Sequence, residues 1–260
     1  MFIVINGYKN KFMKTFFSIT INTFNHVDWI ERCIRSCVEQ DYDNFEVIVL
    51  DDISTDGAFE ICEKIKSEVG DKLIVLQNEN KIYSQVKNIL TLTQQSRPNS
   101  VVVSVDGDDW LKDNQVLNKL EGIYRHGDVW MTYGRYEEHP HGHAPTEYHP
   151  YPSDVIERNS FREYNWLASH LRTYKRELFL MINEDDFKLS DGEWLDVTGD
   201  QAFMLPMLEM SGDKSRFVDE ILYIYNVENP TRDGATKVDR QVEVANYIRG
   251  KERYQRIETI

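Results

Sequence analysis

Two clusters of aspartates follow apolar runs that are typical of buried β-strands. Asp51 and Asp52 come directly after VIVL, and the sequence DGDD at 106–109 comes directly after VVVSV. In open α/β sheets, ligands bind beyond the carboxyl ends of the strands, so both clusters fall where a binding site is expected. Carboxylates gathered at one sheet edge repel one another and raise each other's pKa, a cost that folding alone gives no reason to accept.

A divalent cation would remove this repulsion, and the ligand type indicates which one. Oxygen ligands favour Mg²⁺ or Mn²⁺ over Zn²⁺, and Mg²⁺ commonly lies between one or two carboxylates and substrate phosphates. Aspartate after a strand also forms turns and helix caps, and this alternative stays open for Asp51 and Asp52. Turn formation needs one carboxylate and not three, so Asp106, Asp108 and Asp109 favour a site for a metal and a diphosphate.

The elements that position these clusters alternate between strands and helices. This alternation predicts an α/β fold with a doubly wound, mostly parallel sheet and helices on both faces. Strands are expected at 16–21, 45–50, 73–77, 101–105, 129–133 and 221–225, and helices at 27–38, 58–69, 82–93, about 110–124, 160–168, 175–182, 200–211 and from about 237.

The chain is interpreted as one domain with a more irregular second half. Residues 1–14 form an N-terminal extension, 15–130 form the half with the aspartate clusters, and 131–260 form the second half with a closing helix. A polar, His- and Pro-rich surface loop is expected at 134–153. With 41% hydrophobic and 12% aromatic residues, the chain is expected to pack rather than to be disordered.

The charge balance limits the class of partner. The formal net charge of −14 argues against a nucleic-acid partner, which would need clustered Lys and Arg. No apolar run reaches the length of a transmembrane helix, no signal peptide is recognisable, and three cysteines make no disulfide framework. We therefore expect a cytoplasmic, soluble protein, with peripheral attachment to a membrane and the oligomeric state left open.

Two stretches resemble a known family. The run SITINTFNHVDWIERCIRSCVEQDYDNFEVIVLDDISTDG resembles the opening of family 2 glycosyltransferases, and SVDGDDWL is similar to their Asp-x-Asp metal motif. The resemblance is strong over about residues 16–110 and looser to about 230. It implies a GT-A fold, a nucleotide-sugar donor (a UDP-sugar by default), a glycan or other hydroxyl acceptor, and Mn²⁺ or Mg²⁺ as cofactor.

The resemblance also assigns nucleotide-sugar binding to particular positions. These are Asn22, Thr23, Phe24, Asp51, Asp52, Lys87, Asp106, Gly107 and Asp108. Phe24 replaces the commoner Tyr, which keeps stacking on a base and loses a hydroxyl contact. Lys87 stands where the family often has Arg, so it could face the donor phosphates or be a solvated helix-surface lysine.

For the metal, the resemblance implies Asp106 and Asp108, with Asp109 close by. Family members often carry a further ligand, a His, after the late Tyr-rich strand, where this chain has Glu228. Either Glu228 binds the metal or a ligand comes from elsewhere, such as the His-rich loop. The alternative for that loop is a mobile surface loop that binds no metal. The histidines of that loop are His139, His141, His143 and His149.

The second half carries the implied catalytic base and acceptor side. VTGDQAFMLPML resembles the family segment whose Asp deprotonates the acceptor, which implies Asp200 as base, with Gly199 in place of the usual Glu. Asp200 also fits a helix N-cap, and both roles can hold together. Trp166, His170 and Trp194 are candidates for an acceptor-side sugar platform, although core packing explains the tryptophans nearly as well.

The implied reaction is one in-line displacement that inverts the anomeric carbon. One alternative is a nucleotidyltransferase acting on sugar phosphates, which would want a Gly-rich, basic loop where this chain has NTFNH. Another is a catalytically silent sugar-binding module, because Gly199 and Glu228 depart from the family pattern.

Overall fold

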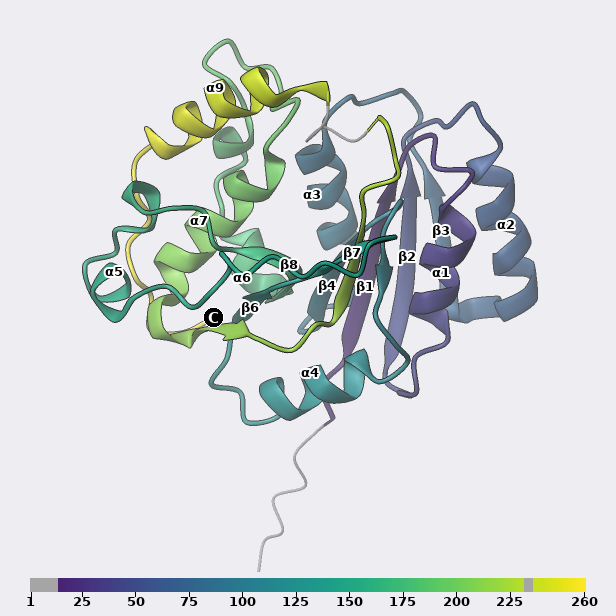
Figure 1. Cartoon of the computed structure of the whole chain (residues 1–260), viewed down its shortest axis with the longest axis horizontal. Coiled ribbons are helices and arrows are strands. Elements are labelled where there is room, and N and C mark those ends of the chain that lie inside the picture. The colour runs from purple at the N-terminus through teal and green to yellow at the C-terminus, as the bar shows by residue number, and fades with distance from the viewer. Residues whose placement is uncertain (1–13, 232–235) are drawn as a thin grey trace, which may run out of the picture.

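The computed structural model describes residues 14–231 and 236–260, and in that part of the chain seven strands form one sheet. The spatial order of the strands is β3 (Leu73–Gln77), β2 (Phe45–Asp51), β1 (Phe17–Thr23), β4 (Val101–Asp106), β8 (Ser169–Lys175), β6 (Met131–Gly134) and β9 (Ser215–Val218). The first four are parallel, whereas β8 runs antiparallel to β4 and β6. The expected doubly wound, mostly parallel sheet is therefore confirmed (Figure 1).

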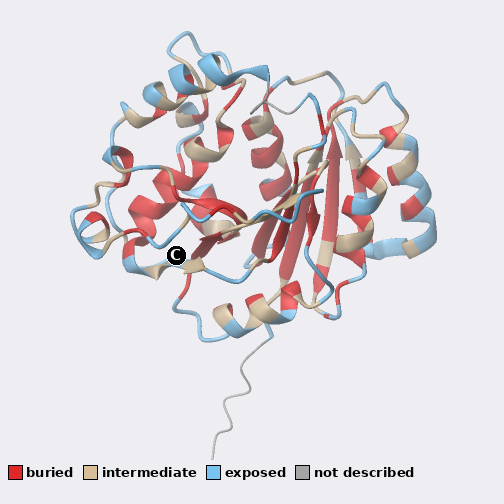
Figure 2. Ribbon diagram, in the orientation of Figure 1, coloured by how far each residue is buried: buried red, intermediate tan, exposed pale blue. Residues whose placement is uncertain are grey.

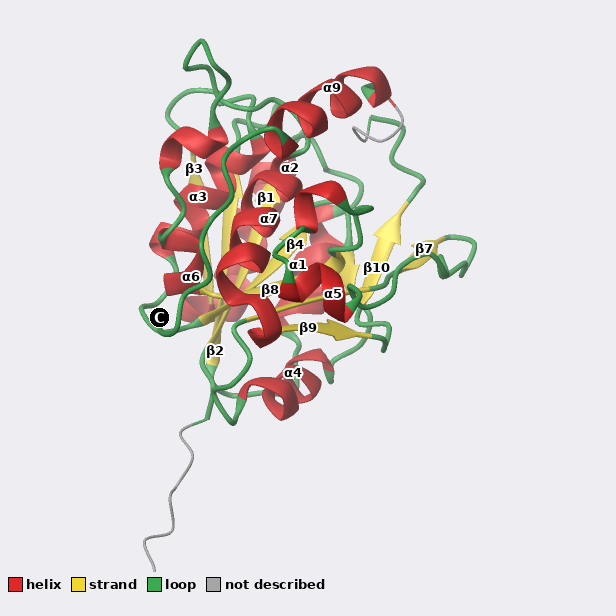
Figure 3. Cartoon of the chain, turned by 90° about the vertical axis from the view of Figure 1, so that its left-hand side faces the viewer, coloured by secondary structure: helices red, strands yellow, loops and turns green. Residues whose placement is uncertain are grey.

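A smaller sheet lies beside the large one. Its order is β5 (Trp110–Leu111), β10 (Tyr223–Asn226) and β7 (Glu137–His139). β10 and β7 lie side by side at one edge of the molecule (Figure 3). The pairing of β10 with β5 brings a late strand close to the chain that leaves β4.

Helices cover both faces of the large sheet. One face packs against α1 (Ile30–Val38), α2 (Ala58–Val69) and α4 (Val116–Tyr124). The other packs mainly against α3 (Gln85–Gln95), α6 (Arg176–Leu180) and α7 (Gly199–Ser211), with α5 (Ser153–Glu157) and α9 (Val238–Arg249) adding to the same core. Short 3-10 helices lie at Gly70–Lys72, Phe161–Glu163, Glu184–Phe187 and Gly212–Lys214.

The near-continuous apolar runs belong to strands that are covered on both faces of the sheet. Along β4, Val101 and Val103 enter the first core and Val102 the second, because alternate side chains of a strand point to opposite faces. The central strands are accordingly buried over most of their length (Figure 2). The three cysteines, Cys33, Cys37 and Cys62, are free and buried.

Two expectations about the second half are wrong. Residues 160–168 contain only a 3-10 turn and extended chain instead of a helix, and 169–175, for which no element was expected, forms β8 inside the large sheet. Pairing with β4 and β6 makes a strand of Ser169–Lys175, where no local pattern predicts one, since local propensity is weaker than tertiary context. The expected extension at 1–14 lies outside the described residues apart from Lys14.

Within the described ranges, no helix combines the length and apolar character needed to cross a bilayer.

Candidate functional site

The carboxyl ends of β1, β2 and β4 meet at one edge of the sheet. The strand register places Thr23 opposite Asp51 and Asn22 opposite Asp106. Gly107 lies so close to β1 that a Cβ there would stand 2.7 Å from the Cβ and Oγ1 of Thr23. Its amide donates to the carbonyl of Asn22 at 3.0 Å, so the turn that carries the later aspartates is fixed by backbone contact.

Asp51 is fully buried and its carboxylate is occupied by protein donors. It accepts hydrogen bonds from the amide of Ser54 at 2.9 Å, from the Ser54 hydroxyl and from Gln77 Nε2 at 2.9 Å. This is the turn chemistry that the sequence left open for Asp51.

Asp52 anchors the loop that precedes α3. Its Oδ1 accepts from Asn78 Nδ2 at 2.8 Å and from the amide of Ile82 at 2.9 Å, and its Oδ2 accepts from the amide of Tyr83 at 3.2 Å. This carboxylate, assigned by the resemblance to nucleotide-sugar binding, therefore also positions the loop before α3.

The aromatic residue predicted to stack on the base lies at the end of β1. Phe24 is partly exposed, and the ammonium group of Lys81 lies 2.6 Å from the centroid of its ring. The same ammonium lies 4.8 Å from the ring of Tyr83, whose side chain is 73% exposed. Two aromatic surfaces and one cation thus flank the edge where a base is expected.

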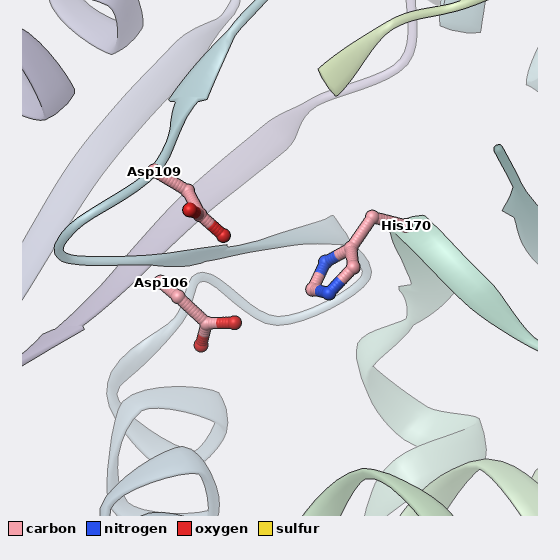
Figure 4. A group of neighbouring side chains, drawn as sticks. All are labelled: Asp106, Asp109 and His170. Atoms are coloured by element: carbon pink, nitrogen blue, oxygen red, sulfur yellow. The ribbon is translucent and has the colours of Figure 1, made fainter. Parts of the chain in front are cut away.

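Asp106, Asp109 and His170 form the centre of the site (Figure 4). Each offers a ligand atom, and these atoms all lie within 4.8 Å of one another. Asp109 is buried and accepts from the Tyr223 hydroxyl and from the amide of Asn226, both at 2.7 Å. Two residues of the late strand β10, Tyr223 and Asn226, thereby fix the turn that carries Asp109.

Burial and mutual repulsion make these carboxylates hard to ionise in the absence of a cation. Burial is the largest cause that raises the pKa of Asp109 well above its ordinary value, and Asp108 and Asp106 raise it further. Burial also raises the pKa of Asp106 to about 6, and Arg172 opposes this rise. Asp108 and Asp200 act in the same direction as burial on Asp106. A divalent cation fits such a site, because it would neutralise the carboxylates that the fold has gathered.

Asp108 and Glu228 lie beside this centre. Asp108 accepts from Asn229 Nδ2 at 2.7 Å, so β10 and the chain after it bind two of the aspartates. The Glu228 carboxylate lies 3.2 Å from His139 Nε2, and 45% of its side chain is exposed. In this arrangement Glu228 pairs with His139, which ends β7 instead of lying in a loop as expected, and Glu228 lies outside the three-residue cluster.

Asp200 lies in the first turn of α7, whose N-cap is Thr198 and not Asp200 as the sequence allowed, and it faces the cluster through an arginine. Its Oδ1 accepts from the amide of Gln201 at 2.8 Å, and its Oδ2 accepts from Arg172 Nη2 at 2.9 Å. Only 11% of the Arg172 side chain is exposed. The structure also explains Gly199, because a Cβ there would stand 3.0 Å from the Cβ of Val86 on α3.

The three predicted acceptor-side residues separate in the structure. His170 joins the aspartates, whereas Trp166 is partly buried against the second core. The ring of Trp194 lies 4.4 Å from the ammonium of Lys87 and 5.1 Å from that of Lys188. Lys87 therefore rests against an aromatic ring and not in open solvent.

Arg172 was not singled out from the sequence. The available signal is its position two residues after His170, a predicted acceptor-side residue. Gln85, which donates to Asp106 Oδ1 at 2.8 Å, gives no signal in the sequence, because a lone glutamine in a helix is too common to select.

The model for glycosyl transferase family 2 matches residues 18–181. Glycosyltransferase GlyG of Streptococcus pneumoniae serotype 4 is 26% identical over 225 residues, which cover 82% of this chain and 71% of GlyG. Glycosyltransferase GlyA of the same organism is 21% identical and covers 81% of this chain, but the chain spans only 30% of GlyA.

Solved structures share the fold. TarS 1-349 of S. aureus in complex with UDP-GlcNAc has a TM-score of 0.63 at 17% identity, covering 90% of this chain and 65% of that one. The mannosyltransferase PcManGT from Pyrobaculum calidifontis, in complex with GDP-Man and Mn²⁺, has a TM-score of 0.60 at 17% identity, covering 92% and 65%.

Proposed function

This chain belongs to glycosyl transferase family 2 and has its GT-A fold, and we propose that it transfers a sugar from a nucleotide-sugar donor, preferably a UDP-sugar, to an acceptor hydroxyl. The observation that carries the proposal is the meeting of Asp106, Asp109, Arg172 and Asp200 at one sheet edge, although they come from three distant segments. The relatives that bind UDP-GlcNAc and GDP-Man support a donor of this class.

We propose that Asp106, Asp108 and Asp109 hold a divalent cation. The fit is supported by the raised pKa of two of these carboxylates and by their oxygen chemistry. Bound there, Mn²⁺ or Mg²⁺ would stabilise negative charge on the departing nucleoside diphosphate. The Mn²⁺ in PcManGT is consistent with this cofactor.

The remaining steps fall to the chain's own residues. Phe24 offers a ring for the base, and Gly107 lets the acidic turn approach β1. Asp200 accepts the proton of the acceptor hydroxyl, and Arg172 holds its carboxylate in place. Attack from the side opposite the leaving group would invert the anomeric configuration.

The test is a nucleotide-release assay with Mn²⁺ and a panel of UDP-, GDP- and dTDP-sugars. Asp200→Asn should lower turnover by about 10²–10⁴-fold while donor binding persists, because only proton transfer is lost. Asp196→Asn is the matched control, since Asp196 lies on the same approach to α7 but pairs with Arg240 at 3.0 Å. Unchanged turnover in Asp200→Asn would remove it from the mechanism, and no release from any donor would favour a silent sugar-binding module.

A further inference from the structure

We propose that His170 is a direct ligand of the divalent cation, beside the aspartates, and that its imidazole makes the site prefer Mn²⁺ to Mg²⁺. This inference rests on the proposed function, because it names the residue that completes the metal site of the same enzyme. The sequence instead predicts His170 on the acceptor side and a further metal ligand at Glu228 or in the His-rich loop.

The antiparallel pairing of β8 with β4 places His170 at the metal site. Ser104 of β4 is opposite Arg172 of β8. This is the last pair of the ladder, and it lies two residues from Asp106 along β4 and two residues from His170 along β8. Consistent with this, His170 offers a ring nitrogen within 4.8 Å of the carboxylate oxygens of Asp106 and Asp109.

One ring nitrogen of His170 lacks a hydrogen-bond partner. The side chain is only 6% exposed, yet its Nδ1 atom is buried without a hydrogen-bond partner. A buried polar atom without a partner is costly and calls for an explanation. Figure 4 shows the imidazole pointing towards the two carboxylates, so a cation between them would supply the missing partner.

Stacking alone does not account for a histidine here. The ring stacks on Tyr223 with a centroid distance of 4.4 Å and an interplanar angle of 11°. A phenylalanine could make the same stack without burying an unpaired nitrogen. Tyr223 also donates to Asp109, so one side chain positions both the imidazole and a carboxylate, as outer-shell partners of metal ligands do.

The alternative ligand is engaged elsewhere. Glu228 pairs with His139 at 3.2 Å and is partly exposed at the protein surface. A site with one imidazole and carboxylates also differs in metal preference from an all-oxygen site, because Mg²⁺ is bound almost entirely by oxygen ligands, whereas Mn²⁺ also accepts an imidazole nitrogen. The substitution of one ligand type therefore changes which metal the site selects.

The experiment uses the full chain with Mn²⁺ as the probe, with and without UDP. Pulsed electron paramagnetic resonance should detect nitrogen coupling to bound Mn²⁺ in the wild type and none in His170→Phe, which keeps the stacking ring. Mn²⁺ affinity should fall by at least about tenfold, since even outer-shell losses cost that much. Preference for Mn²⁺ over Mg²⁺ should fall with it.

His143→Phe is the matched control, because it makes the same substitution at an exposed histidine of the loop. Glu228→Gln tests the competing ligand and should leave Mn²⁺ affinity unchanged. His170→Cys guards against misfolding of the Phe variant: with Co²⁺ it should show sulfur-to-metal charge-transfer absorption if position 170 lies in the coordination sphere.

Nitrogen coupling that survives in His170→Phe, or affinity lost in Glu228→Gln instead, would overturn the inference. A wild type that transfers sugar but shows no nitrogen coupling would overturn it and leave the proposed function intact. A wild type that shows the coupling but releases no nucleotide from any donor would support His170 as a ligand and contradict the proposed function.

Discussion

The two sides of the site are built in different ways. On one side, β1, β2 and the turn after β4 come from residues 17–111 and are held by parallel pairing and close backbone contact. On the other side, β8, the start of α7 and β10 come from residues 169–229 and contribute single side chains: His170, Arg172, Asp200 and Tyr223.

We expect this difference to separate donor binding from catalysis. The first side is predicted to receive the nucleotide, and its acids are fixed by neighbours in the sheet. The second side completes the site through long-range contacts, such as Arg172 with Asp200 and Tyr223 with Asp109. Changes on the first side should therefore cost stability, and changes on the second should cost turnover with little loss of stability.

The largest effect on stability is expected on the first side, at Gly107. Gly107→Ala would place a methyl group 2.7 Å from Thr23 and should lower the free energy of unfolding by about 3 kcal/mol, as overpacking does. Denaturant unfolding measures this. Gly122→Ala, at an exposed helical position with open space around it, should instead raise the stability by about 0.5–1 kcal/mol. Equal behaviour of the two variants would contradict the close-contact explanation.

A smaller effect, on turnover, is expected on the second side. Arg172→Gln should lower kcat by about tenfold, or about 1.4 kcal/mol, because Asp200 loses the donor that orients it. Donor KM should change little, and Arg172→Lys should recover part of the rate. Arg176→Gln is the control, since Arg176 binds the carbonyls of Thr93 and Gln94 instead of the site. A rise in KM at constant kcat would make Arg172 a donor-binding residue.

The smallest effect is expected on the pH dependence of stability, through Asp106, whose pKa is influenced by residues of both sides. Its folded pKa, about 6, lies above the ordinary value of 3.8, so between these pH values the folded state holds the extra proton. Stability of the metal-free protein should therefore fall as pH rises through this window and level off above about 7. In Asp106→Asn this part of the decline should be absent.

Calorimetry from pH 5.5 upward measures this as a difference in Tm of a few degrees. Added Mn²⁺ should restore Tm in the wild type at pH 7 more than in Asp106→Asn, because the cation replaces the lost proton. Parallel Tm curves for the two proteins would show that Asp106 is not the group that titrates.

The accuracy of the sequence predictions follows the same division. The runs before Asp51 and Asp106 predicted both strands, because a strand buried on both faces is apolar at every position. The prediction for the stretch after Trp166 was wrong. β8 forms because it pairs with β4 and β6, and the sequence of one strand does not show which strands it will pair with. Arg172 was missed for the same reason.

The sequence by itself determined the βα alternation, the acidic turns and the family, since these depend on residues close together in the chain. Only the tertiary structure decided which side chains meet those turns from β8, α7 and β10. That assembly brought His170 to the aspartates and left Glu228 beside His139. The physical reason is that register between distant strands is set by packing of the whole core, which no local pattern encodes.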